Sequence, residues 1–169
     1  KAKLFVSGQR QIHVALDEIK TWKVQNPGKQ IIWFHCASLG EFEQGRPIIE
    51  SLKVNYPNRQ VVLSFFSPSG YEIRKNYEYV DHIFYLPSDL PDTAISLIRY
   101  FDPEIFILVK YEFWWNLLEA LSKAKCKIYL VSGVFREGDY FLSPLFTPFK
   151  NILKNFNGIF VQDELSERV

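Results

Sequence analysis

Residues 31–47, with the sequence IIWFHCASLGEFEQGRP, place an acidic side chain soon after an apolar segment. The apolar run predicts a buried strand, and the small residues before Glu41 predict a turn that leads into a helix. In an open α/β sheet, a turn of this kind lies at the carboxyl end of a strand, where ligands bind. Glu41 would then lie beside the free N–H groups of a helix start. This combination suits acid–base chemistry on an anionic or sugar substrate.

The same residues also match a purely structural motif. Ser38 and Glu41 have the spacing of a capping box, in which Ser38 caps the helix and Glu41 accepts a hydrogen bond from a backbone N–H group. The residues alone leave both roles open. The segment lacks the patterns GxGxxG and GxxxxGK[ST], which argues against a dinucleotide or ATP at this turn.

A second turn, Ser67-Pro68-Ser69-Gly70, follows the next apolar run. Its hydroxyls and helix-start N–H groups could bind a phosphate or a carboxylate. A proline turn with an ordinary N-cap residue would have the same sequence, so the structural alternative stays open here too.

Residues 110–116, KYEFWWN, follow a strongly apolar run. Adjacent aromatic rings beside Lys110 and Glu112 suit stacking on a sugar and hydrogen bonding to its hydroxyls. A helix start with its aromatic side chains in the core is the alternative. Because neighbouring residues point in different directions on a helix, Trp114 and Trp115 cannot both face one core.

Composition narrows the classes of function. The net charge is +1, which gives no argument for a nucleic-acid partner. Cys36 and Cys126 are isolated, so a reducing compartment is expected rather than a disulfide framework. His35 could line the site or be a buried strand-end histidine. No His, Cys and Asp residues have metal-ligand spacing, and we expect neither a metal nor a cofactor.

The order of elements predicts one α/β domain over residues 1–169, with a Rossmann-like parallel sheet covered by helices on both faces. The expected strands are 31–35, 61–65, 82–86, 104–109, 127–131 and 158–161. The expected helices are 9–26, one ending at 56, a short one after 67–70, then 90–100, 113–123, 143–155 and one from 164. Right-handed crossovers place the strand-to-helix turns at one edge. That edge would gather Glu41, Ser67, Ser69, Asp89, Glu112 and Arg136.

The motifs, taken in order, resemble the N-terminal domain of the 3-deoxy-D-manno-octulosonic acid (Kdo) transferases of lipopolysaccharide synthesis. The similar segments are Trp33 to Glu41, Ser67 to Gly70, Leu86-Pro87-Ser88-Asp89-Leu90-Pro91, Lys110 to Asn116, and Val161 through Arg168. The resemblance covers most of residues 30–169. Two positions depart from it, since Lys110 replaces a common glutamate and Trp115 a common proline.

The resemblance implies a GT-B glycosyltransferase that is inverting and independent of metal. This chain would be its acceptor-binding half, inactive alone, and a C-terminal domain absent from the chain would bind CMP-Kdo. The implied acceptor is a lipid A precursor at the cytoplasmic face of the inner membrane, with an N-terminal anchor preceding Lys1. Glu41 would be the general base. The expected substrate-binding residues are Ser38, Gly40, Ser67, Ser69, Gly70, Lys110, Glu112, Trp114, Asn116 and Arg136.

Two other functions are alternatives to this one. Another GT-B enzyme with a lipid-linked acceptor would be expected to have a glycine-rich GGTGGH-type loop after the first strand, which is absent. A non-catalytic flavodoxin-like binding module would have paired acids or a phosphate loop there, and neither is present.

Residues 140–150, YFLSPLFTPFK, form an aromatic and proline-rich segment near Arg136 and Lys154. Its composition suits a lipid-facing patch beside anionic headgroups. The alternative is that these aromatic residues cover the edge of the sheet.

Overall fold

The computed structural model describes residues 12–28, 30–110, 112–139 and 151–168. It contains a six-stranded sheet with the strand order β3-β2-β1-β4-β5-β6, and every neighbouring pair is parallel. The strands are β1 (Ile31–Cys36), β2 (Gln60–Phe65), β3 (His82–Tyr85), β4 (Pro103–Val109), β5 (Lys127–Gly133) and β6 (Phe156–Val161). The predicted α/β fold is therefore confirmed, with the strand order of a Rossmann sheet.

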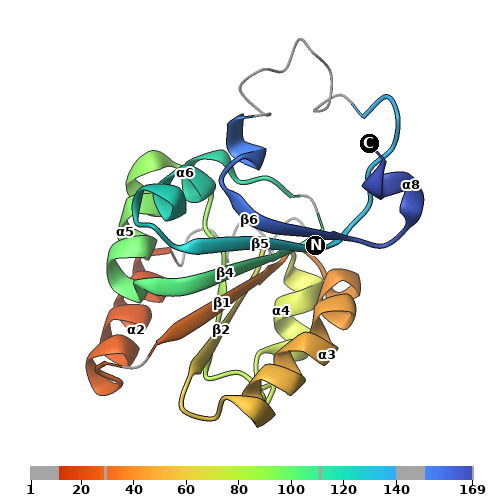
Figure 1. Cartoon of the computed structure of the whole chain (residues 1–169). Helices are drawn as coiled ribbons and strands as arrows, with labels where there is room; N and C mark the ends of the chain where they lie inside the picture. The colour runs from red at the N-terminus through yellow and green to blue at the C-terminus, as the bar shows by residue number, and fades with distance from the viewer. Residues whose placement is uncertain (1–11, 29, 111, 140–150, 169) are drawn as a thin grey trace.

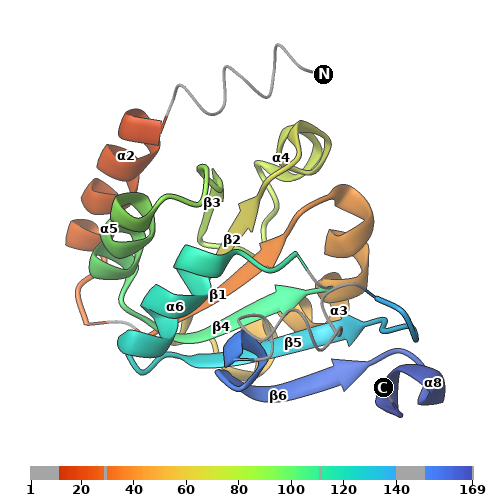
Figure 2. The same ribbon diagram turned by 90° about the horizontal axis from the view of Figure 1, so that it is seen from above.

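Helices cover both faces of the sheet (Figures 1 and 2). One face carries α2 (Ile12–Gln25), α5 (Pro91–Phe101) and α6 (Trp115–Lys123), and the other carries α3 (Leu39–Asn55) and α4 (Pro68–Arg74). The last described helix is α8 (Glu164–Glu167), which follows β6. This covering explains why all six residues of β1 and of β2 are buried.

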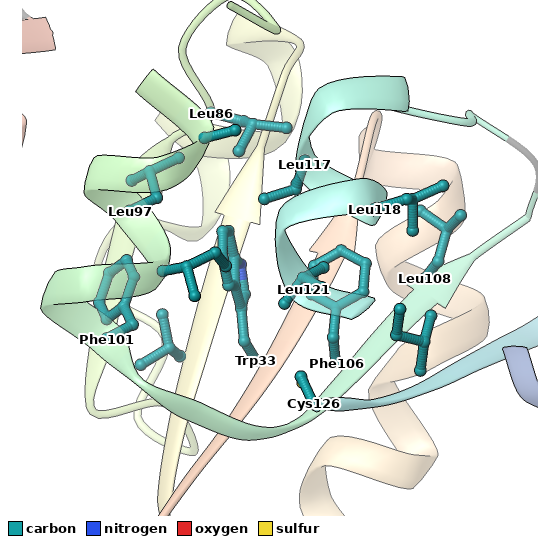
Figure 3. Packing of buried hydrophobic residues seen from close by; sticks show 14 of the residues in the cluster. Trp33, Leu86, Leu97, Phe101, Phe106, Leu108, Leu117, Leu118, Leu121 and Cys126 are labelled. Carbon is teal, nitrogen blue, oxygen red and sulfur yellow. The ribbon is translucent and has the colours of Figure 1, made fainter. Parts of the chain in front are cut away.

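Each face of the sheet has its own apolar core. Trp33 lies on the face of α5 and α6, where it packs between Phe101 and Phe106 (Figure 3). Phe34 points to the opposite face and belongs to the cluster that contains Phe42 of α3. The side-chain alternation along β1 thus divides its residues between two cores, and each fully buried large side chain contributes about 1.5–3 kcal/mol.

Several predicted boundaries were wrong by a few residues. The sixth strand begins at Phe156 rather than at residue 158, and the fifth extends to Gly133 rather than ending at residue 131. Helix α6 begins at Trp115 rather than at Phe113, because the backbone N–H groups of Asn116 and Leu117 are held by another loop. Of the helix predicted at 143–155, residues 151–153 are helical, whereas the part before them lies outside the described residues.

Candidate functional site

The site lies where the chain changes direction within the sheet. From β1 the chain continues to β2 on one side, whereas β4 pairs with β1 on the other side. In doubly wound sheets, the carboxyl ends of two such strands border the crevice that binds ligands. Glu41 follows β1, and Lys110 and Glu112 follow β4. The predicted residues at these two strand ends therefore lie at the position that such a crevice occupies, where Glu41 interacts electrostatically with Lys110 and Glu112.

Glu41 lies in the first turn of α3 and is partly buried. Its Oε2 atom accepts a hydrogen bond of 2.5 Å from the backbone N–H of Ala37, and its own N–H donates to Ser38 Oγ over 3.4 Å. The capping contacts expected as the structural alternative are thus present. They leave room for chemistry, because a carboxylate has two oxygens and about four acceptor positions.

Electrostatics keep this carboxyl more basic than an ordinary glutamate. Burial raises the pKa of Glu41, while hydrogen bonds from the backbone at Ala37 and Ser38, and the charge of Lys110, partly oppose this rise. A general base works best when its pKa lies nearer to the working pH. The direction of this shift therefore suits proton acceptance.

Lys110 places a positive charge beside the turn that holds Glu41. Leu108 of β4 pairs with His35 of β1, and two residues further along each chain Lys110 lies level with Ala37. Its φ of 63° lies in the left-handed region, which non-glycine residues rarely adopt and which often marks functional sites. Burial and the charge of Glu41 raise the pKa of Glu112, which places this second carboxyl in the field of the first.

Gly40 leaves space beside Glu41. A Cβ atom at Gly40 would meet no heavy atom of the described residues within 4 Å, and Gly40 is exposed. By contrast, a Cβ at Gly45 on the same helix would lie 2.9 Å from Val109 Cγ2. Packing explains the glycine at 45 but not the glycine at 40, so the open space at Gly40 is available to a ligand.

The turn at residues 67–70 lies next to the Glu41 turn. The Ser67 N–H donates to the carbonyl of Ala37 over 2.8 Å, which joins the two turns directly. The Ser67 and Ser69 hydroxyls are 2.8 Å apart and bond to each other, and Ser67 also caps α4. Gly70 is buried against the ring of Phe65, so packing explains this glycine. Substrate binding by these residues remains a prediction.

Aromatic side chains pack against one another at the same edge of the sheet. The ring of Trp114 lies 4.7 Å from that of Phe66 and 5.7 Å from that of His35, centroid to centroid. His35 is fully buried beneath Trp114, and its Nδ1 lies 2.8 Å from Ser64 Oγ. Burial lowers the pKa of His35 to about 3, so its imidazole is neutral. Trp115 is 39% exposed, which confirms that the two tryptophans do not share one core.

The structure gives Asn116 and Arg136 protein partners of their own. The Asn116 side-chain amide donates to the carbonyl of Asp89 over 2.7 Å. Arg136 forms an ion pair of 3.1 Å with Asp163 and donates to Ser166 Oγ over 3.2 Å. These contacts hold neighbouring elements together. The predicted contacts of Asn116 and Arg136 with substrate remain predictions.

Three other expectations concern metals and membranes. Within the described ranges, no group of three or more His, Cys, Asp or Glu side chains could hold a metal ion. No helix in the described part of the chain is long and apolar enough to cross a membrane. The predicted lipid-facing patch at 140–150 lies outside the described residues.

Comparison with known proteins agrees with the motifs at this crevice. The model of the 3-deoxy-D-manno-octulosonic-acid transferase (kdotransferase) family matches residues 10–169. The chain belongs to the Kdo transferase family. The resemblance inferred from the motifs is thereby confirmed.

Individual members of the family are similar over different lengths. A 3-deoxy-D-manno-octulosonic acid transferase of Haemophilus influenzae is 34% identical over 97 residues, which cover 56% of this chain and 22% of that protein. The corresponding protein of Aquifex aeolicus is 32% identical over 91 residues, covering 53% and 25%. That of Chlamydophila psittaci is 24% identical over 149 residues, covering 84% and 34%. The chain therefore spans between about a fifth and a third of the length of these relatives.

Among solved structures, the D-arabinose dehydrogenase of Sulfolobus solfataricus aligns with 91% of this chain and 43% of its own, at 15% identity and a TM-score of 0.44. This likeness is too distant to bear on the function.

Proposed function

We propose that this chain is the acceptor-binding part of an inverting, metal-independent glycosyltransferase that moves Kdo from CMP-Kdo to a lipid A precursor. The observation that supports this proposal most is the position and the raised pKa of the Glu41 carboxyl group. Its carboxylate is fixed at the crevice by the Ala37 N–H, and burial makes it a stronger proton acceptor. Membership of the Kdo transferase family supplies the class of substrate.

In the proposed reaction, an acceptor hydroxyl donates a hydrogen bond to the Glu41 carboxylate. The hydroxyl oxygen forms a bond to the anomeric carbon of Kdo as its proton passes to Glu41. The bond from that carbon to the phosphate oxygen of CMP breaks, and the electron pair leaves with CMP. Attack on the face opposite to the leaving group inverts the anomeric centre.

The other predicted residues would orient the acceptor around Glu41. Gly40 leaves room for the acceptor to approach, and Lys110 contributes a positive charge that suits an anionic substrate. The CMP-Kdo donor would be bound by a second Rossmann-like domain of a GT-B enzyme, outside residues 1–169. We place the reaction at the cytoplasmic face of the inner membrane, where a lipid acceptor is accessible.

Substitution of Glu41 by Gln in the full-length protein tests the proposal. Loss of a general base lowers the rate about 10²- to 10⁴-fold. Loss of a helix-capping contact costs only about 1 kcal/mol of stability. Transfer of Kdo from CMP-Kdo to a lipid A precursor should therefore almost disappear, while the melting temperature changes little.

Glu43 provides a matched control on the same helix. Its carboxylate pairs with Arg74 over 2.6 Å and with Arg46 over 3.3 Å, on the side of α4. Glu43→Gln should lower stability slightly and keep the transfer rate. If Glu41→Gln transfers Kdo as fast as Glu43→Gln at a temperature where both are folded, Glu41 is only a capping residue and the proposed mechanism is wrong.

A further inference from the structure

Helix α6 takes its N-terminal cap from a distant loop. Among the described residues, Trp114 occupies the N-cap position without a capping hydrogen bond from its side chain. Instead, Asp89 in the loop between β3 and α5 accepts two hydrogen bonds of 2.9 Å, from the N–H of Asn116 to Oδ2 and from the N–H of Leu117 to Oδ1. A carboxylate at a helix N-terminus is also favoured by the helix dipole.

The connection is reciprocal. The side-chain amide of Asn116 donates to the backbone carbonyl of Asp89 over 2.7 Å. Three hydrogen bonds therefore join the loop and the helix start, although Asp89 and Asn116 are 27 positions apart in the sequence. Asp89 and Trp114 also line one small pocket together with Leu86 and Leu117.

These bonds fix the segment that completes the crevice. Trp114 immediately precedes α6, and its ring covers His35 and contacts Phe66. Glu112 lies two residues before Trp114, and the charge of Glu41 contributes to the raised pKa of its carboxyl group. If the start of α6 shifts, Trp114 and Glu112 must shift relative to Glu41, which is held separately by α3 and the Ala37 N–H.

We propose that Asp89 is a positioning residue for the transfer reaction, acting on the crevice through the start of α6. This inference rests on the proposed function only for its catalytic readout. In geometric terms, both carboxylate oxygens of Asp89 are needed to hold Trp114 in place. Sequence reasoning placed Asp89 at the correct edge but gave it no role.

The experiment compares Asp89→Asn with Asp81→Asn in the full-length protein. An asparagine at 89 has only one acceptor oxygen, so one of the two backbone hydrogen bonds must be lost. Asp81 is a matched control because it also bridges elements, accepting from the Val61 N–H over 2.8 Å and pairing with Lys53. It lies at the amino ends of β2 and β3, away from the crevice.

Both variants should melt earlier, but only Asp89→Asn should lose activity. A displacement near 1 Å in an active site can cost about 100-fold, so we expect kcat/KM to fall about 10- to 100-fold. The assay is run at a temperature where both variants are folded. If kcat/KM of Asp89→Asn matches that of Asp81→Asn, the bonds serve stability alone and the inference is overturned.

A second readout does not depend on the proposed reaction. The NMR signal of the Trp114 indole, assigned by its loss in Trp114→Phe, should shift in Asp89→Asn and stay in place in Asp81→Asn. An unshifted Trp114 signal in Asp89→Asn overturns the inference even if activity falls. Conversely, if the signal shifts as expected but Glu41→Gln retains full activity, the proposed function fails while the positioning of Trp114 by Asp89 stands.

Discussion

Replacing Gly40 by alanine tests separately what folding and what substrate binding require at this position. Gly40 is the second residue of α3 and directly precedes Glu41. No heavy atom among the described residues lies within 4 Å of a Cβ built at this position, and its φ is not positive. The fold therefore gives no reason for a glycine here. A methyl group would instead occupy the space through which the acceptor is proposed to approach Glu41.

The expected change in stability can be estimated from helix propensity and packing. Alanine is favoured over glycine in a helix by about 0.5–1 kcal/mol, and Gly40 lies in the first turn, so we expect a gain of about 0.5 kcal/mol. For a domain of this size, this corresponds to a melting temperature about 1–2 °C higher.

Gly45→Ala is the matched control on the same helix. Its Cβ would lie 2.9 Å from Cγ2 of the buried, β-branched Val109. Overpacking costs about 1–3 kcal/mol, so a net loss of about 1–2 kcal/mol is expected.

Thermal unfolding followed by circular dichroism measures the first effect, and Kdo transfer by the full-length protein measures the second. Gly40→Ala should be at least as stable as the unchanged protein and yet transfer Kdo about 10-fold more slowly or worse, because the acceptor is displaced from Glu41. Gly45→Ala should show the opposite pattern, lower stability with a smaller loss of transfer. A Gly40→Ala variant that is stable and fully active would show that the acceptor does not use this space. A strongly destabilised one would refute the packing argument itself.

Two further predictions concern pH. The charge of Lys110 lowers the pKa of Glu41, so Lys110→Gln should raise that pKa. The acidic limb of the pH profile of kcat/KM should then move to higher pH. An unchanged limb would show that the two groups do not interact. Burial lowers the pKa of His35 to about 3 and that of His82 to about 4, whereas both titrate near 6.5 when unfolded. The unfolded state therefore binds more protons below pH 6.5, and the free energy of unfolding should fall between pH 6.5 and 4 by about 1.4 kcal/mol per pH unit for each histidine. His82→Phe, which keeps an aromatic ring against Trp22, should reduce this slope in urea titrations at pH 5 and 7, and an equal slope would contradict the assignment.

The fold could be predicted because its signals are local. The runs at 31–36 and 60–65 are mostly apolar, which predicts strands covered on both faces, and the structure buries every one of these residues, including the polar His35, Gln60 and Ser64. Turn residues between the runs then separate strands from helices. The alternation of these elements leaves a parallel sheet as the natural solution, and the right-handed crossover rule gathers the turns at one edge. For the same reason, Glu41, Lys110 and Glu112 could be expected at neighbouring strand ends.

The contacts at the site could not be predicted, because they join residues far apart in the sequence. Asp89 and Asn116 lie in separate motifs, and only the hydrogen bonds that Asp89 forms with Asn116 and Leu117 show that it caps the helix of the other motif. Arg136 was expected to bind substrate, but its pairing with Asp163 depends on where β6 ends and α8 begins. The glycines at 40 and 70 look alike in their motifs. Only packing separates them, since Gly70 abuts Phe65 and Gly40 meets open space.

The capping role of Glu41 and its proposed catalytic role support each other physically. A general base must stay in place while a proton moves, and a side chain held only by solvent would have to be ordered at each turnover. The hydrogen bond from Ala37 provides that order within the folded protein. The same bond stabilises the charged carboxylate and would, on its own, make it a weaker base. Burial outweighs this effect and raises the pKa of Glu41, so the carboxyl is both fixed and basic. A capping box placed at the crevice between β1 and β4 can therefore perform acid–base chemistry, whereas the same motif at an exposed helix start would contribute only stability.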